Sequence, residues 1–225
     1  MKEKRAVLCD LDDTFYVCKP GEDAGLSAVV AAVSAALDLS SSDVEKAYAD
    51  ARRAVKARID GRGSSHSRLL YICELVHQLG RPDMLVRVRS WERTFWNAYL
   101  AAVSLRPRVL PFLTATRRSG RKVALVSDLT LEVQLHKLDR FGLFRHLDAI
   151  AISEEVPLDK PAEEIFRLAM ERIGAKPEEC VMVGDHDNKD GEGARRLGIP
   201  FVRIAPDDVD GAGFDALARD LGIFA

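Results

Sequence analysis

Short apolar runs alternate with longer stretches of helical periodicity along much of the chain. Runs of this kind, rich in apolar and β-branched residues, are typical of strands buried on both faces. They occupy residues 6–9, 123–126, 180–183 and 201–204, with a weaker one at 149–152. Between them lie helical patterns that each stop at a glycine, a common signal for the end of a helix. These patterns cover 129–141, 162–173 and 190–197. Strands that alternate with helices predict a parallel sheet of the α/β class.

Residues 20–105 break this alternation, because no convincing strand occurs there. Three helices are predicted instead, over 42–59, 65–79 and 84–103. A loop of this length without structure of its own would be unusual in a domain. We therefore expect an all-helical subdomain, 20–105, inserted into a core made of 1–19 and 106–225.

Side-chain patterns define the three helices of this segment. The first begins with a capping box of Ser42 and Glu45. The second is expected to place six apolar residues on one face: Leu69, Leu70, Ile72, Cys73, Val76 and Leu79. The third carries four aromatic residues at helical spacing: Trp91, Phe95, Trp96 and Tyr99. We interpret this aromatic stripe as the core of the helical segment rather than as a platform for a nucleobase.

Composition narrows the class of protein. The 225 residues are 47% hydrophobic and 30% charged, as in globular proteins, and the formal net charge of −2 argues against nucleic acid as a ligand. No apolar run is long enough to predict a transmembrane helix, and the charged N-terminus does not resemble a secretory signal. The cysteines form no CxxC pair, so we expect reduced thiols and a cytoplasmic location. They are Cys9, Cys18, Cys73 and Cys180.

Acidic, hydroxyl and lysine side chains follow the predicted strands. In an open parallel sheet, ligands bind beyond the carboxyl ends of the strands, so these side chains should converge. They are Asp10, Asp12, Asp13 and Thr14 after the first strand, Ser127 and Asp128 after the second, Lys160 after the third, and Asp185 and Asp190 after the fourth. Clustered carboxylates repel one another unless a cation lies among them, and a divalent cation with oxygen ligands would compensate them.

Such groups suit phosphoryl transfer. A carboxylate can attack phosphorus and form an aspartyl-phosphate, and a second carboxyl group can exchange protons with the leaving oxygen and with water. A magnesium ion and a lysine can offset the charge of the phosphoryl oxygens, and a serine hydroxyl can hold one of them.

The order of these motifs resembles the haloacid dehalogenase-like (HAD) hydrolase superfamily. The resemblance rests on Asp10-x-Asp12-x-Thr14, an apolar run ending in Ser127, Lys160-Pro161, and Gly184-Asp185 followed by Asp190, and it covers nearly the whole chain. It implies a Rossmann-like, doubly wound parallel sheet with a helical cap inserted after the first motif. The cap would close over the substrate and exclude bulk water.

The resemblance also implies a role for each matching residue. Asp10 would be the nucleophile and Asp12 the general acid and base. Mg²⁺ would be held by Asp10, by the backbone carbonyl of Asp12 and by Asp185, with Asp190 as a further ligand or a support. Ser127 and Lys160 would bind the phosphoryl group, and the Thr14 hydroxyl would orient the loop. Asp128 departs from the uncharged residue of many relatives, so it is expected either to contact substrate or to form a salt bridge.

These features together predict a cytoplasmic, Mg²⁺-dependent phosphatase that acts through an aspartyl-phosphate. Its partner would be a small phosphorylated metabolite, namely a sugar phosphate, phosphoglycolate or a nucleoside monophosphate, with no nucleic acid or membrane partner and a homodimer as the oligomer to consider. The acid at position 12 favours phosphate esters over halides, because halide leaves without a proton. Two alternatives stay open: a phosphomutase of the same superfamily, and a non-catalytic binding or scaffold protein on a relic HAD fold.

Overall fold

Two compact units make up the chain. The computed structural model describes residue 1 and residues 3–223. The first unit combines Met1–Val17 with Ser104–Ala225, and the second is the continuous segment Cys18–Val103. The first unit holds every strand of the sheet described below, whereas the elements of the second, which is described throughout, are helical.

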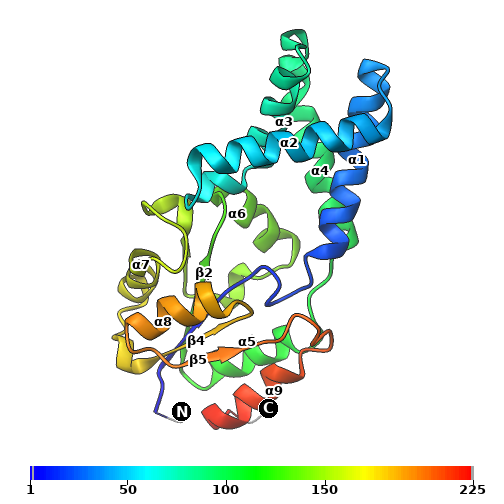
Figure 1. The fold of residues 1–225 in the computed structure, drawn as a ribbon. Coiled ribbons are helices and arrows are strands. Elements are labelled where there is room, and N and C mark those ends of the chain that lie inside the picture. Colours follow the sequence, from blue (N-terminus) through cyan, green and yellow to red (C-terminus); the bar gives the residue numbers. More distant parts are fainter. Residues whose placement is uncertain (2, 224–225) are drawn as a thin grey trace. The chain divides into compact units, whose positions relative to one another are not determined.

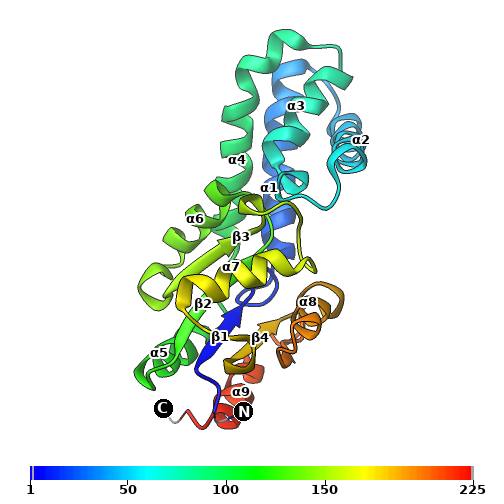
Figure 2. The same cartoon turned by 90° about the vertical axis from the view of Figure 1, so that its left-hand side faces the viewer.

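The first unit is built on a five-stranded sheet in the order β3-β2-β1-β4-β5. Its strands are β1 (Ala6–Cys9), β2 (Lys122–Ser127), β3 (Ala149–Ile152), β4 (Cys180–Gly184) and β5 (Phe201–Arg203). All neighbouring strands are parallel, so the predicted α/β class with a parallel sheet is confirmed. The first strand in the sequence is the central one, with β2 on one side and β4 on the other (Figure 2).

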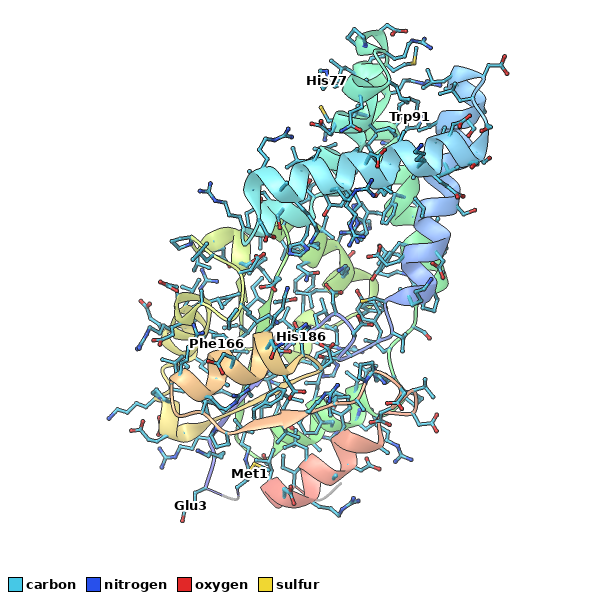
Figure 3. The ribbon with its side chains drawn as sticks, in the orientation of Figure 1. Met1, Glu3, His77, Trp91, Phe166 and His186 are labelled. Atoms are coloured by element: carbon cyan, nitrogen blue, oxygen red, sulfur yellow. The ribbon has the colours of Figure 1, made fainter. Side chains whose placement is uncertain are left out.

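Helices cover both faces of this sheet. They are α5 (Val109–Arg118), α6 (Leu131–Arg140), α7 (Glu163–Ile173), α8 (Glu192–Arg196) and α9 (Ala212–Leu221). Ala6 and Leu8 share a core with Phe166 of α7, which is labelled in Figure 3. Successive side chains of a strand point to opposite faces. Val7 and Cys9 therefore face the other side, where α5 packs on β2 and on α9 (Figure 1).

The register brings the carboxyl ends of three strands to one edge. Cys9, the last residue of β1, is paired with Leu125 of β2 and with Val183 of β4. β2 ends at Ser127, two residues beyond its pair, and β4 ends at Gly184, one residue beyond its pair, so the three strand ends lie close together. This edge is where the sequence predicts a ligand site.

Four helices form the second unit: α1 (Lys19–Leu37), α2 (Ser41–Ile59), α3 (Arg68–Gln78) and α4 (Val88–Ala102). α1 lies alongside α4, as Figure 2 shows, and α2 packs on α3. Gly21 and Gly25 make the first contact close: a Cβ at Gly21 would come within 2.9 Å of Tyr99, and one at Gly25 within 2.9 Å of Phe95. Glycine at these positions lets the two helix surfaces interlock.

The aromatic stripe of α4 is the core of the helical unit, as predicted. Trp91, Phe95, Trp96 and Tyr99 are all buried, and Trp91 is labelled in Figure 3. The ring centroids of Phe95 and Trp96 are 5.1 Å apart, in an edge-to-face arrangement that aromatic pairs favour.

Two details predicted for the helical segment are wrong. The cap of α2 is Ser40, whose side chain accepts a hydrogen bond from the Asp43 amide, rather than Ser42. A serine followed three residues later by an acidic residue occurs twice here, as Ser40 with Asp43 and as Ser42 with Glu45, so the sequence allows two positions for the cap. The apolar face predicted for the second helix is wrong in part: Leu69 and Leu70 are exposed, and the buried face of α3 consists of Tyr71, Ile72, Leu75 and Val76.

Membrane-spanning potential is limited to one bent pair of helices. Over residue 1 and residues 3–223, no single helix has the length and apolar composition of a membrane span, although α1 and α2 meet the criterion when they are taken together across their bend.

Candidate active site

Asp10 lies at the centre of the site, one residue beyond β1. Its amide donates to the carbonyl of Val183 at 2.9 Å, which continues the ladder and fixes the backbone at this point. One carboxylate oxygen of Asp10 accepts from Lys160 Nζ at 2.6 Å, and the other accepts from Thr14 Oγ1 at 3.0 Å. Asp10 is 4% exposed, and each of its carboxylate oxygens is oriented by a hydrogen bond.

Lys160 joins three strand ends. Its ammonium donates to Asp10, to Asp190 Oδ1 at 2.7 Å and to the carbonyl of Val126 at 3.1 Å. Burial alone would lower the pKa of this ammonium, but the carboxylates of Asp10 and Asp190 raise it well above its ordinary value. Lys160 is therefore a buried and fully paired cation, which is the condition under which a charge is tolerated inside a protein.

Asp190 is held close to β4 by the absence of a side chain at Gly184. A Cβ at Gly184 would lie 2.3 Å from Asp190 Oδ2. That oxygen accepts from the amide of His186 at 3.1 Å. Asp190 belongs to a π-helical turn, Asp187–Gly191, that leads from β4 into α8, and Figure 3 labels His186 at its start. Both oxygens of Asp190 thus have hydrogen-bond partners.

Three carboxylates face one another at this sheet edge. Asp10, Asp185 and Asp190 each offer an oxygen, and these oxygens lie within 4.8 Å of one another. Burial raises the pKa of the Asp10 carboxyl to about 8; Lys160 opposes the rise, and Asp190 and Asp185 add to it. Burial and the carboxylates of Asp190 and Asp13 also raise the pKa of Asp185. The three carboxyl groups therefore resist being ionised at the same time unless further positive charge is present.

The loop after β1 is clamped by a buried arginine. Asp13 adopts a left-handed backbone conformation, with φ of 58°, which is uncommon for a residue with a side chain. Its carbonyl accepts from Arg106 at 2.7 Å. The same guanidinium donates to the carbonyls of Pro206 and Asp208, so the loop of Asp10 is tied to the C-terminal part of the unit.

Asp12 accepts hydrogen bonds from several donors. Lys137 Nζ lies 2.7 and 2.8 Å from its two oxygens, Gln134 Nε2 lies 3.1 Å from one, and the Tyr16 hydroxyl donates to the other. Burial alone would raise the pKa of Asp12, but the Lys137 ammonium and the hydrogen bonds hold it below its ordinary value. We call Tyr16, Gln134 and Lys137 the Asp12 cage.

Sequence reasoning missed Gln134 and Lys137. They lie three residues apart on α6 and share its buried face with Leu138. Two polar residues on an otherwise apolar helix face were the available signal, because such residues require polar partners when they are buried.

Ser127 and Asp128 follow β2 and have different surroundings. Ser127 is buried, and its hydroxyl accepts from Gln134 at 2.7 Å. Asp128 accepts from the backbone amide of Lys160 at 2.9 Å and from Lys189 Nζ at 2.8 Å. Of the two alternatives expected for Asp128, the salt bridge is present, with Lys189. The hydrogen bond from the Lys160 amide anchors the segment that carries Lys160.

The donor set fits a hard divalent cation. Mg²⁺ prefers oxygen ligands and is often held by one or two carboxylates. Asp10 and Asp185 offer carboxylate oxygens to one point, and the raised pKa values mark a place where added positive charge is favourable. The residues present therefore suit Mg²⁺ chemically.

A hydrolase family and several phosphatases resemble this chain over most of its length. Residues 4–198 match a hydrolase family described as haloacid dehalogenase-like hydrolase. A ribulose-1,5-bisphosphate 5-phosphatase from Halopiger xanaduensis is 34% identical, with 90% of this chain and 85% of that protein aligned. A glyceraldehyde 3-phosphate phosphatase from Methanopyrus kandleri is also 34% identical, with 89% and 83% aligned.

A solved structure shares the fold. The crystal structure of a HAD phosphatase from Thermococcus onnurineus matches with a TM-score of 0.75 and 24% identity, and it covers 97% of this chain and 98% of that one. The family match extends from before β1 to beyond α8, so it includes β1 to β4 and the site residues that follow them. The chain belongs to the haloacid dehalogenase-like hydrolase family.

Proposed function

We propose that this protein is a Mg²⁺-dependent phosphatase that removes the phosphoryl group from a small sugar phosphate. The observation that carries the proposal is the Asp10 carboxylate itself. It is buried at a sheet edge, held by Lys160 on one oxygen and by Thr14 on the other, and faced by two further carboxylates. A carboxylate with a fixed orientation beside a buried cation is suited to attack on phosphorus.

The first step would transfer the phosphoryl group to Asp10. A carboxylate oxygen of Asp10 forms a bond to phosphorus while the bond from phosphorus to the substrate oxygen breaks. That oxygen takes a proton from the Asp12 carboxyl group, and the alcohol leaves. The negative charge of the bound phosphoryl group raises the proton affinity of Asp12, which supports its use as an acid.

The second step would release phosphate. Water attacks phosphorus and gives a proton to Asp12, the bond from phosphorus to Asp10 breaks, and inorganic phosphate departs. Ser127 and Lys160 would bind the phosphoryl oxygens in both steps. When it is bound by Asp10, Asp185 and the Asp12 carbonyl, Mg²⁺ supplies charge neutralisation for those oxygens. Asp190 would support the site by orienting Lys160, since both its oxygens already accept hydrogen bonds.

The substrate class rests on the relatives. The two relatives described above are named for phosphate removal from ribulose-1,5-bisphosphate and from glyceraldehyde 3-phosphate. We propose a substrate of the same kind for this protein. The helical unit Cys18–Val103, a continuous insertion between β1 and β2, would serve as the cap that selects it.

The test is phosphate release from a panel of monoesters with Mg²⁺. The panel includes ribulose-1,5-bisphosphate, glyceraldehyde 3-phosphate, phosphoglycolate, nucleoside monophosphates and a hexose phosphate. We expect release from at least one sugar phosphate, and Asp10→Asn should lose roughly a thousandfold or more in kcat, since a neutral amide is a poor nucleophile.

The outcomes separate the alternatives. If Asp10→Asn keeps more than a few per cent of wild-type turnover, Asp10 is not the nucleophile. Full activity in excess EDTA would contradict the dependence on Mg²⁺. Movement of the phosphoryl group to another position of the sugar, without phosphate release, would indicate a phosphomutase. No turnover of any ester would favour a binding protein.

A further inference from the structure

We propose that the Asp12 cage, formed by Tyr16, Gln134 and Lys137, positions Asp12 for proton exchange with the leaving oxygen. The inference rests on the proposed phosphatase function, in which Asp12 is the acid and base. The three cage residues are positioning residues, because they act through Asp12 and not on the substrate.

The geometry of Lys137 supports this role. Its ammonium lies 2.7 and 2.8 Å from the two oxygens of Asp12, so it holds the whole carboxyl group and not one atom of it. The Lys137 side chain is only 2% exposed, whereas that of Asp12 is 28% exposed. A long and flexible side chain is thus fixed inside the protein, with its charged end at the carboxyl group that must remain accessible. Burial of a lysine is costly unless its charge is paired and hydrogen-bonded, as it is here with Asp12.

Gln134 connects Asp12 to the phosphate-binding end of β2. Its side-chain nitrogen lies 3.1 Å from Asp12 Oδ2, 2.7 Å from Ser127 Oγ and 2.8 Å from the Asp128 carbonyl. The carboxylate and the carbonyl only accept hydrogen bonds, so the nitrogen and not the oxygen of the amide must face them. The amide oxygen is buried and has no hydrogen-bond partner. A buried carbonyl without a partner is unfavourable. The amide keeps this orientation nonetheless, because its nitrogen then donates to Asp12 and to the end of β2.

Tyr16 completes the cage from the loop of the nucleophile itself. Its hydroxyl donates to Asp12 Oδ1, its ring lies 5.0 Å from that of Phe141, and the Lys137 ammonium lies 6.0 Å from the ring centroid. The cage therefore fixes Asp12 relative to α6 and to Ser127. This fixes the distance between the group that exchanges protons and the group that would bind the phosphoryl oxygen.

A test follows from the leaving group. Proton donation matters most for alkyl phosphates, whose alcohols leave poorly, and least for p-nitrophenyl phosphate. The measured quantity is kcat/KM, which covers substrate binding and the first step and is insensitive to the later hydrolysis. We expect Lys137→Met to lower kcat/KM by roughly 30-fold or more for the best alkyl ester and by less than about fivefold for p-nitrophenyl phosphate. Tyr16→Phe, which keeps the packing of the ring, should show the same asymmetry at smaller size.

Three comparisons make the assignment specific. Lys137→Arg should recover part of the alkyl activity, because it restores charge and donors. Lys137→Met should cost little when it is added to Asp12→Asn, because both changes remove the same function. Lys122→Met is the matched control: Lys122 is exposed and pairs with Asp148, and its replacement should affect neither ester.

Equal losses for both esters in Lys137→Met and in Tyr16→Phe would overturn the inference, and so would full additivity with Asp12→Asn. Each of these results would leave the proposed phosphatase function intact. A wild-type protein that hydrolyses neither ester would contradict the proposed function, and the inference with it.

Discussion

At the scale of single residues, the site depends on one buried cation shared by two carboxylates. Lys160 pairs with Asp10 and Asp190, and all three side chains are almost fully buried. Loss of one partner of such a group leaves an uncompensated buried charge, which is strongly destabilising. The three residues are therefore expected to be energetically coupled, so that single substitutions report on the whole group.

Protonation of this acidic group should control Mg²⁺ binding. The pKa of Asp10 in the folded protein is raised to about 8 by burial, above the value of about 3.9 for an exposed aspartate. Between these values the folded metal-free protein retains a proton that the unfolded chain has lost. Its free energy of unfolding should therefore fall as the pH rises through this window.

Mg²⁺ bound as proposed would compete with that proton, so its stabilising effect should increase with pH. We expect the Mg²⁺-induced rise in Tm to be larger at about pH 8 than at about pH 6. Thermal unfolding with and without MgCl₂ at the two pH values measures it, and Asp185→Asn is the control that should abolish the shift. A shift of the same size at both pH values would contradict this linkage.

Residue-level prediction from the sequence succeeded in part. The motifs at the strand ends indicated which side chains would gather, and the structure brings Asp10, Asp185, Asp190 and Lys160 together. The sequence motifs did not indicate the Asp12 cage. Partners such as Lys137 come from a helix face whose orientation depends on tertiary packing, which a single sequence does not specify.

At the scale of elements, the end of β4 combines a glycine with a turn that folds back on it. The Asp190 carboxylate occupies the space where a Gly184 side chain would lie. Such close approach of a side chain to backbone is possible only at glycine.

Gly184→Ala should therefore displace Asp190 and weaken its hold on Lys160. We expect a loss of about 1–3 kcal/mol in the free energy of unfolding, which corresponds to a fall in Tm of about 2–4 °C per kcal/mol. Calorimetry measures the loss. Gly80→Asn is the matched control, because its surroundings are open and asparagine tolerates the left-handed backbone there. Equal Tm changes for both variants would argue against a close-approach role for Gly184.

Strands were predicted more accurately than helix ends. Four-residue apolar runs such as Ala6–Cys9 can hardly be anything but buried strands once they alternate with helices. Helix starts depend on which of several neighbouring serines caps them, and Ser40 and Ser67 take that role here. The face that a helix buries depends on its tertiary packing, and α3 buries Tyr71 and Leu75 while Leu69 and Leu70 remain exposed.

At the scale of the whole molecule, one continuous segment carries its own core. Within the helical unit, Arg68 lies over the rings of Phe95 and Trp96 and pairs with Glu22. The residues that hold one another in this unit all come from Cys18–Val103. Such a segment can be exchanged without interrupting the sheet.

Exchange of this segment tests its proposed role in selecting the substrate. A chimera that carries the corresponding residues of the Methanopyrus kandleri relative should keep Mg²⁺-dependent hydrolysis of p-nitrophenyl phosphate. Its order of preference among sugar phosphates should change, with kcat/KM ratios shifting by roughly 10–200-fold. The same exchange with Asp10→Asn should be inactive. An unchanged order of preference would assign specificity to the sheet edge instead.

The central position of β1 has a consequence for how the protein is made. β1 leaves the ribosome first, yet Ala6 pairs with Lys122 and with Cys180, which are synthesised much later. The helical unit ends at Val103, before β2 begins at Lys122 and well before β4 begins at Cys180. We therefore expect the insertion to fold while β1 still lacks β4 as a partner, so that the sheet edge around Asp10 is complete only after β4 and Asp190 have been synthesised.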